Sequence, residues 1–207
     1  MFEDINLQVI CIVLGTLFVS TALHEMMHAY VALRLGDDLA HSHGRITLNP
    51  LKHIDPILTV VLPLALMLLG STPILAAKPV PINVSRLKGR EMGMALVGLA
   101  GPVTNLALAC VAALVLRNIA LAGLMLDVVA YFFYINIGLF VFNMLPLPPL
   151  DGSRVLYAVA PEPVQRVMEQ IESYGIMVII LFVSLFYSVI GPLVFSWQQA
   201  IARLLLG

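Results

Sequence analysis

Apolar residues form five long stretches that are separated by polar connections. The stretches are residues 7–33, 57–70, 92–116, 121–145 and 174–206. A helix needs about 20 apolar residues to cross the hydrocarbon core of a bilayer, because each residue advances the helix by about 1.5 Å. Four of the stretches reach this length. The pattern therefore predicts an all-α polytopic membrane protein with four to five transmembrane helices.

The stretch 57–70 is shorter than a standard span. It holds fourteen residues between Pro56 and Ser71. Pro63 lies in its middle, and proline removes a helical hydrogen bond and clashes with the preceding turn. A segment of this length is more typical of a re-entrant or interfacial element than of a full crossing.

The positions of Lys and Arg test this interpretation, because both residue types collect in short loops on the cytoplasmic side. If 57–70 crosses the bilayer fully, the two sides receive six and five basic residues. If it returns to the side from which it entered, nine lie on one side and only Arg117 and Arg203 on the other. The charge distribution therefore favours the re-entrant arrangement, which places the amino terminus outside and the polar connections in the cytoplasm.

The polar connections carry their own structural signals. Residues 34–55 are rich in turn formers and lack helical periodicity, so they predict short strands or a loop at the membrane face. Residues 77–90 contain Pro79 and Pro81, which favour an extended segment. Gly191 and Pro192 interrupt the last apolar stretch, which predicts either one kinked span or a span followed by an interfacial helix.

Composition supports one membrane-embedded domain, residues 1–207. The chain is 60% hydrophobic and 11% charged, and four or five spans leave little room for a separate soluble domain. A net charge of −1 without any basic run argues against nucleic acid as a partner. Cys11 and Cys110 lie in apolar stretches, so neither a disulfide framework nor a cysteine metal site is expected. The acidic amino terminus predicts a retained first span rather than a signal peptide.

The first apolar stretch contains the sequence His24-Glu25-Met26-Met27-His28. Residues four apart share one face of an α-helix, so both imidazoles can reach a single ion. This spacing is typical of two zinc ligands with a glutamate between them as general base, here Glu25. Such residues are costly inside a span unless they serve a buried polar site. The alternative is a pair of interfacial or packing histidines beside a solvated glutamate.

A catalytic zinc ion needs a third protein ligand, and Asp151 is the best candidate. It follows Pro146, Pro148 and Pro149, which end the fourth long stretch, and Gly152 beside it permits a tight turn. The alternative is a helix-capping aspartate, because residues 153–160 can begin a helix.

Topology favours the ligand interpretation of Asp151. His24 and His28 lie near the end of the first span, and Asp151 lies just past the end of the stretch 121–145. They can meet only if both helices run in the same direction, which requires an odd number of crossings between them. The re-entrant arrangement supplies one crossing, 92–116. We therefore predict one Zn²⁺ per chain, held by these three side chains.

Asn105 and Asn143 are further polar residues in apolar stretches. A side-chain amide there could hold an extended substrate backbone or stabilise a developing oxyanion. The alternative is hydrogen bonding between helices. His41, His43 and His53 fit best as surface or packing residues of the polar connection.

Three motifs in this order resemble the site-2 proteases, which are intramembrane zinc metalloproteases: the residues 24–28, the sequence Gly-Pro-Val-Thr-Asn at 101–105, and 143–152 ending in Leu-Asp-Gly. The runs 44–50 and 77–81 are similar to the compact bacterial and archaeal branch. The resemblance implies the same zinc ligands and general base, within a core of three helices that water reaches through a polar channel. Unlike many relatives, this chain leaves no room for a PDZ or CBS domain.

The expected function is therefore that of an intramembrane zinc metalloendopeptidase acting in regulated intramembrane proteolysis. Its expected partners are the lipid bilayer and single-pass membrane-protein substrates, and its active site is expected toward the cytoplasmic side of the cell membrane. A metal transporter would require polar residues that trace a path through both leaflets. A binding protein that keeps the fold without turnover is the other alternative, although every expected ligand is present.

Overall fold

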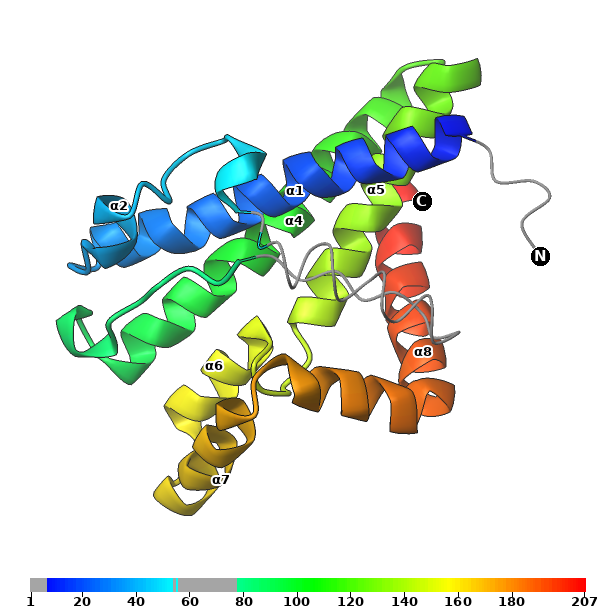
Figure 1. The fold of residues 1–207 in the computed structure, drawn as a ribbon. Coiled ribbons are helices and arrows are strands. Elements are labelled where there is room, and N and C mark those ends of the chain that lie inside the picture. Colours follow the sequence, from blue (N-terminus) through cyan, green and yellow to red (C-terminus); the bar gives the residue numbers. More distant parts are fainter. Residues whose placement is uncertain (1–6, 54, 56–77) are drawn as a thin grey trace.

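The computed structural model describes residues 7–53, 55 and 78–207. Within these residues every regular element is helical, and no strand occurs. Figure 1 shows their arrangement. The elements are α1 (Leu7–Arg34), α2 (Leu39–Ser42), η1 (Pro50–Lys52), η3 (Val84–Arg86), α4 (Glu91–Asn118), α5 (Gly123–Asn143), α6 (Asp151–Val159), α7 (Glu162–Ser173) and α8 (Ile176–Leu206).

Four helical segments of the described chain are long and apolar enough to cross a membrane. They are Leu7–Arg34, Glu91–Asn118, Gly123–Asn143 and Ser188–Leu206. Large apolar side chains remain exposed on each of them, for example Leu14, Val111, Leu126 and Phe195. Lipid solvates such side chains, whereas water would not. The prediction of an all-α, multi-pass membrane protein is therefore confirmed.

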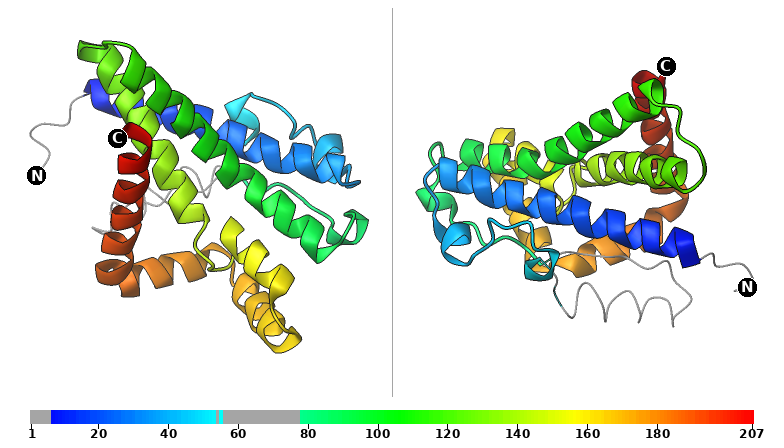
Figure 2. Two further views of the ribbon diagram at one scale, coloured as in Figure 1. Left: turned by 180° about the vertical axis from the view of Figure 1, so that it is seen from behind. Right: turned by 90° about the horizontal axis from the view of Figure 1, so that it is seen from above.

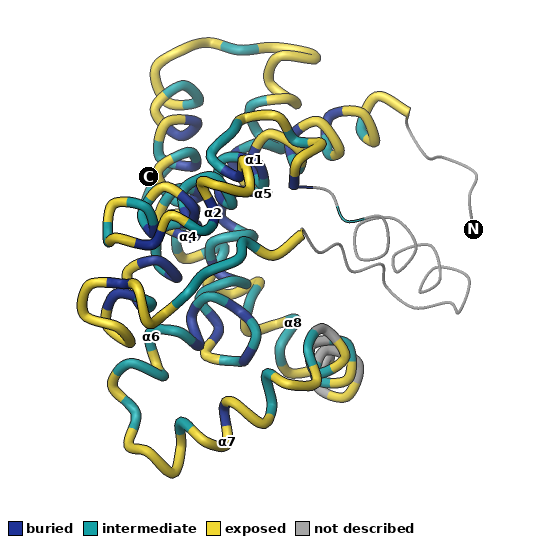
Figure 3. Tube along the Cα trace, turned by 60° about the vertical axis from the view of Figure 1, so that its left-hand side comes forward, coloured by how far each residue is buried: buried dark blue, intermediate teal, exposed yellow. Residues whose placement is uncertain are grey.

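The helices pack through small residues. Ala109, Ala112 and Ala113 of α4 form a buried cluster with Phe133 and Ile137 of α5, and Ala202 of α8 joins it. Alanine lets helix backbones approach closely, which matters in lipid because no hydrophobic effect drives helices together there. Figures 2 and 3 show α1, α4 and α5 crossing one another, with burial concentrated where they meet and α7 exposed over most of its length.

The polar connection after α1 forms the short helices α2 and η1, joined by turns. The prediction of short strands is therefore wrong for residues 35–53, and the loop alternative holds only between these two helices. The buried Asp37 carboxylate accepts hydrogen bonds from Leu39 N at 3.1 Å and from Asn83 N at 2.6 Å. Farther along, the Asn49 side chain caps η1 by accepting from Leu51 N. These side chains bind backbone N–H groups that a strand would need for pairing with a neighbour.

Both polar connections lie side by side at one end of α1 and α4. Lys78 N donates to His53 O at 2.9 Å, and Lys88 N donates to Leu35 O at 2.8 Å. The buried Arg45 guanidinium donates to Lys52 O at 2.9 Å and to Pro79 O at 3.3 Å. The predicted re-entrant segment 57–70 lies outside the described residues.

The last apolar stretch is a single helix, α8, with Pro192 inside it. Pro192 has no N–H to donate to the carbonyl of Ser188, and such a missing bond is a common cause of a bend. Figure 1 shows α8 bent, with its final part beside α5. Only this part, Ser188–Leu206, qualifies as a span.

We expect the Asp37 contacts to stabilise the polar connection. Asp37→Ala leaves the N–H groups of Leu39 and Asn83 without their acceptor and should lower the free energy of unfolding by about 1–3 kcal/mol. The neighbouring Asp38 forms an exposed ion pair with Arg86 at 2.6 Å, so Asp38→Ala should cost less than about 1 kcal/mol. Denaturation of both variants in detergent measures the difference. Equal losses would contradict the assigned role of Asp37.

Candidate metal centre

The first two candidate ligands lie on one face of α1. His24 and His28 are each 6% exposed, and their Nε2 atoms are 3.0 Å apart. One helical turn separates the two residues, which brings the imidazoles together as their spacing predicts. The two rings meet edge to face with centroids 4.6 Å apart.

The third candidate ligand arrives from α6. Asp151 Oδ2 lies 3.1 Å from His24 Nε2 and 3.4 Å from His28 Nε2. Asp151 is the first residue of α6, and no side-chain bond caps that helix at Leu150. A Cβ on Gly152 would overlap the carbonyl of Met144, so glycine is needed for α6 to turn back against the end of α5. The predicted convergence of two imidazoles and one carboxylate is present.

Two glycines allow helix α4 to lie directly against the centre. A Cβ at Gly101 would lie 2.5 Å from His24 Nε2, and a Cβ at Gly98 would lie 3.0 Å from Asp151 O. Real Cβ atoms essentially never approach that closely in the first case. The absent side chains therefore let one helix contact both α1 and the start of α6.

The outer nitrogen of each histidine faces a carbonyl oxygen. His28 Nδ1 lies 2.6 Å from Val97 O, and His24 Nδ1 lies 2.6 Å from Asn105 Oδ1. An oxygen of this kind only accepts, so Nδ1 carries the proton in both rings. The neutral imidazoles consequently turn their Nε2 lone pairs toward each other and toward Asp151.

The inner atoms of the centre fit a cation. Asp151 Oδ2 is buried, and within residues 7–53, 55 and 78–207 no group donates a hydrogen bond to it. Two lone pairs and a carboxylate oxygen within 4.8 Å of one another repel unless a positive charge lies among them. Two nitrogens and one oxygen are a donor set that zinc accepts with a fourth position left open.

The remaining predicted residues occupy different places. Glu25 is half-buried beside the histidines, and the described part of the chain offers it no hydrogen-bond partner. Asn143 is half-buried at the end of α5, where its Nδ2 donates to Leu139 O at 3.0 Å. Asn105 is fully buried, and both ends of its amide are engaged, by His24 and Asn136. This placement favours orientation of His24 over contact with substrate.

The sequence alone did not indicate Asn136, Ser20 or the Val97 carbonyl as parts of the centre. Asn136 carries a usable signal, because it is a side-chain amide in the middle of an apolar span. His41 and His43 are exposed, and His53 is buried with its Nε2 3.0 Å from Thr47 O, so all three belong to the polar connection.

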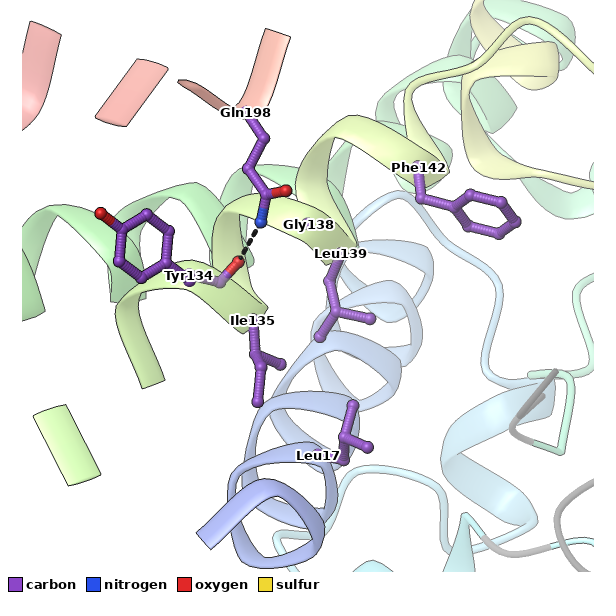
Figure 4. Close-up of a pocket in the computed structure, with 7 residues that line it drawn as sticks. All are labelled: Leu17, Tyr134, Ile135, Gly138, Leu139, Phe142 and Gln198. Carbon is purple, nitrogen blue, oxygen red and sulfur yellow. Dashed lines mark hydrogen bonds between the residues drawn. The ribbon is translucent and has the colours of Figure 1, made fainter. Parts of the chain in front are cut away.

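An apolar groove lies apart from the centre. It is lined by Leu17 of α1, by α5 residues that include Ile135 and Leu139, and by Gln198 of α8 (Figure 4). Gln198 Nε2 donates to Tyr134 O at 2.8 Å and joins α8 to α5. None of the candidate ligands lines this groove.

Comparison with known proteins identifies the family. The family model described as peptidase family M50 matches residues 117–186. The Bacillus subtilis protein named "Putative zinc metalloprotease YwhC" is 39% identical over 91% of this chain and 88% of its own length. "Putative zinc metalloprotease Rip2" of Mycolicibacterium smegmatis is 29% identical over 84% of this chain and 66% of its own length.

The Methanocaldococcus jannaschii protein named "Putative zinc metalloprotease MJ0611" is 31% identical over 75% of each chain. The comparison with solved structures found no significant match. The chain therefore belongs to peptidase family M50, the site-2 protease family, which confirms the resemblance seen in its motifs.

Gly101→Ala should disrupt the metal centre without unfolding the helices. The added methyl group would lie 2.5 Å from His24 Nε2, so the imidazole must leave its position, and we expect affinity for added Zn²⁺ to fall by about 10- to 100-fold or more. Gly15→Ala on α1 is the matched control, because its Cβ would meet nothing within 4 Å. Chelator competition on both purified variants measures the effect. Wild-type affinity in Gly101→Ala would show that the close approach of α4 is unimportant.

Proposed function

We propose that this chain is an intramembrane zinc metalloendopeptidase that hydrolyses peptide bonds in or near transmembrane segments of other membrane proteins. The observation that carries the proposal is the meeting of His24, His28 and Asp151, whose inner atoms lie 3.0–3.4 Å apart. The zinc metalloprotease names of the relatives and the four apolar helices support it. One zinc ion per chain accounts for the set of ligands.

Zinc bound by these three residues would supply Lewis-acid chemistry, lowering the pKa of water and polarising a carbonyl. The chain provides the proton transfers. Glu25 follows His24 directly on α1 and is half-buried, so its carboxylate can face the open side of the centre. It accepts the proton of the attacking water and returns it to the leaving amine as the carbon–nitrogen bond breaks.

The proposed substrates are single-pass membrane proteins, cleaved in regulated intramembrane proteolysis within the lipid bilayer. A transmembrane helix must unwind locally before its backbone can reach a buried centre, because its carbonyls are occupied by helical hydrogen bonds. Asn143 is the candidate for holding the unwound backbone or the oxyanion. It lies at the end of α5, eight residues before Asp151, and is half-buried rather than sealed in the core.

The amino terminus is proposed to lie outside the cell, with the metal centre toward the cytoplasmic side. Nine of the eleven basic residues fall on the cytoplasmic side in this arrangement. The hydrogen bonds that join Lys78 to His53 and Lys88 to Leu35 support it, because they hold both polar connections at the same end of α1 and α4. The proposal extends to one membrane-embedded domain over residues 1–207, with no nucleic-acid partner.

Glu25→Gln should abolish cleavage and leave zinc bound. The amide keeps the shape of the side chain but cannot accept the proton, and loss of a general base lowers a rate by about 10²- to 10⁴-fold. Asp151→Asn should lose both zinc and activity. We would incubate each purified protein in detergent with a panel of single-pass substrates, detect products by mass spectrometry and measure zinc content. Full activity in Glu25→Gln would remove it from the mechanism.

Removal of the metal gives an independent measurement. A strong chelator should abolish cleavage by the wild type, because the three ligands cannot polarise the scissile carbonyl without a bound metal ion. Added Zn²⁺ should restore cleavage. Zinc flux across the membrane of proteoliposomes that contain the protein tests the alternative that it is a transporter. Metal flux without proteolysis would overturn the proposal.

A further inference from the structure

The side chains behind His24 form a chain of hydrogen bonds that crosses three helices. His24 Nδ1 lies 2.6 Å from Asn105 Oδ1 on α4. Asn105 Nδ2 donates to Asn136 Oδ1 on α5 at 2.9 Å. Asn136 Nδ2 donates to Ser20 Oγ on α1 at 2.9 Å and to Phe132 O at 2.8 Å. Asn105, Asn136 and Ser20 are all fully buried, so water does not compete for these bonds.

The hydrogen bond to the Phe132 carbonyl fixes the direction of every other hydrogen bond in this series. The Phe132 carbonyl can only accept, so the amide nitrogen of Asn136 must face it and the amide oxygen must face Asn105. Asn105 then directs its own nitrogen to Asn136 and its oxygen to His24. Because that oxygen also only accepts, the proton of His24 must lie on Nδ1.

We propose that Asn136 is a positioning residue for the metal centre. It acts through Asn105 to keep the lone pair of His24 on Nε2, the atom that faces His28 and Asp151. His28 needs no side chain in the role of Asn105, since the backbone carbonyl of Val97 accepts directly from its Nδ1. This inference rests on the proposed zinc centre, where an outer partner of a ligating histidine sets its tautomer and its basicity.

A purely structural role for Asn136 makes a different prediction. Asn136 also joins α5 to α1 through Ser20, and hydrogen bonds of this kind contribute to helix association in lipid. If that were its only role, any replacement that preserves packing would leave the tautomer of His24 unchanged. The direction of the hydrogen bonds, rather than their presence, therefore has to be tested.

Two replacements of Asn136 separate the roles. Asn136→Leu fills the space but releases Asn105, whose amide can then turn its nitrogen toward His24. Asn136→Asp, in its protonated form, can donate its O–H to Phe132 O and keep its carbonyl oxygen facing Asn105, so the orientation of Asn105 is retained. Thr104→Val is the control, because it also removes a polar group from a membrane helix but one outside this series of hydrogen bonds. The Thr104 hydroxyl, on α4, donates to Ala100 O at 2.8 Å.

Chelator competition in detergent gives the first readout. We expect Asn136→Leu to raise the dissociation constant for Zn²⁺ by about 10-fold, and Asn136→Asp and Thr104→Val to stay close to the wild type. Equal weakening in Asn136→Leu and Thr104→Val would overturn the proposal, because it would indicate general packing damage. Equal weakening in both Asn136 variants would overturn it as well, since only one of them releases Asn105.

Nitrogen-15 chemical shifts of labelled histidine give the second readout, in metal-free protein at alkaline pH. The wild type should show His24 protonated at Nδ1 and unprotonated at Nε2, and Asn136→Leu should show a mixture of tautomers. A wild-type proton on Nε2 would overturn the proposal even if no variant folds. If the wild type takes up no zinc, the proposed function fails, while these shifts still test the role of Asn136 on their own.

Discussion

The centre depends on the absence of side chains from one face of α4. Three electron-rich atoms come from α1 and α6, two elements more than a hundred residues apart in the sequence. The backbone of α4 at Gly98 and Gly101 is the surface on which both rest. Because lipid offers no hydrophobic force to press these elements together, close backbone contact and hydrogen bonds must hold them. A single methyl group at Gly101 would occupy the space that the imidazoles fill.

The same low-dielectric surroundings explain why the histidines have fixed outer partners. A buried polar group without a partner costs more free energy than a satisfied bond gains, so each Nδ1 is assigned a carbonyl oxygen. With the protons of His24 and His28 on Nδ1, the lone pairs of both rings lie on Nε2 and point toward Asp151. The repulsion among them and Asp151 is therefore built into the fold, and a cation relieves it.

The sequence predicted the parts of the structure that follow from local periodicity and from counting crossings. The first three of the four long spans and the shared face of His24 and His28 followed from these rules, and of the last stretch only Ser188–Leu206 qualifies as a span. Asp151 does approach the histidines, but the re-entrant segment on which that prediction rested lies outside the described residues. The turns after α1 were harder, because Asp37 finds its partner at Asn83, 46 residues away, and no local pattern shows that pairing. The role of Asn105 likewise depended on Asn136 in another helix, since an isolated amide in a span is equally compatible with binding substrate.

The placement of the centre along α1 determines how it can work. His28 lies six residues and His24 ten residues before the end of α1 at Arg34, which corresponds to distances of roughly 9 and 15 Å along the helix axis at 1.5 Å per residue. Helix α4 closes the inner side, where both imidazoles are buried. The side chain of Asp151 remains 21% exposed, and Glu25 is half-buried. The exposed part of Asp151 is therefore the side from which water and an unwound substrate would approach under the proposed function, and Glu25 is the proposed proton acceptor there.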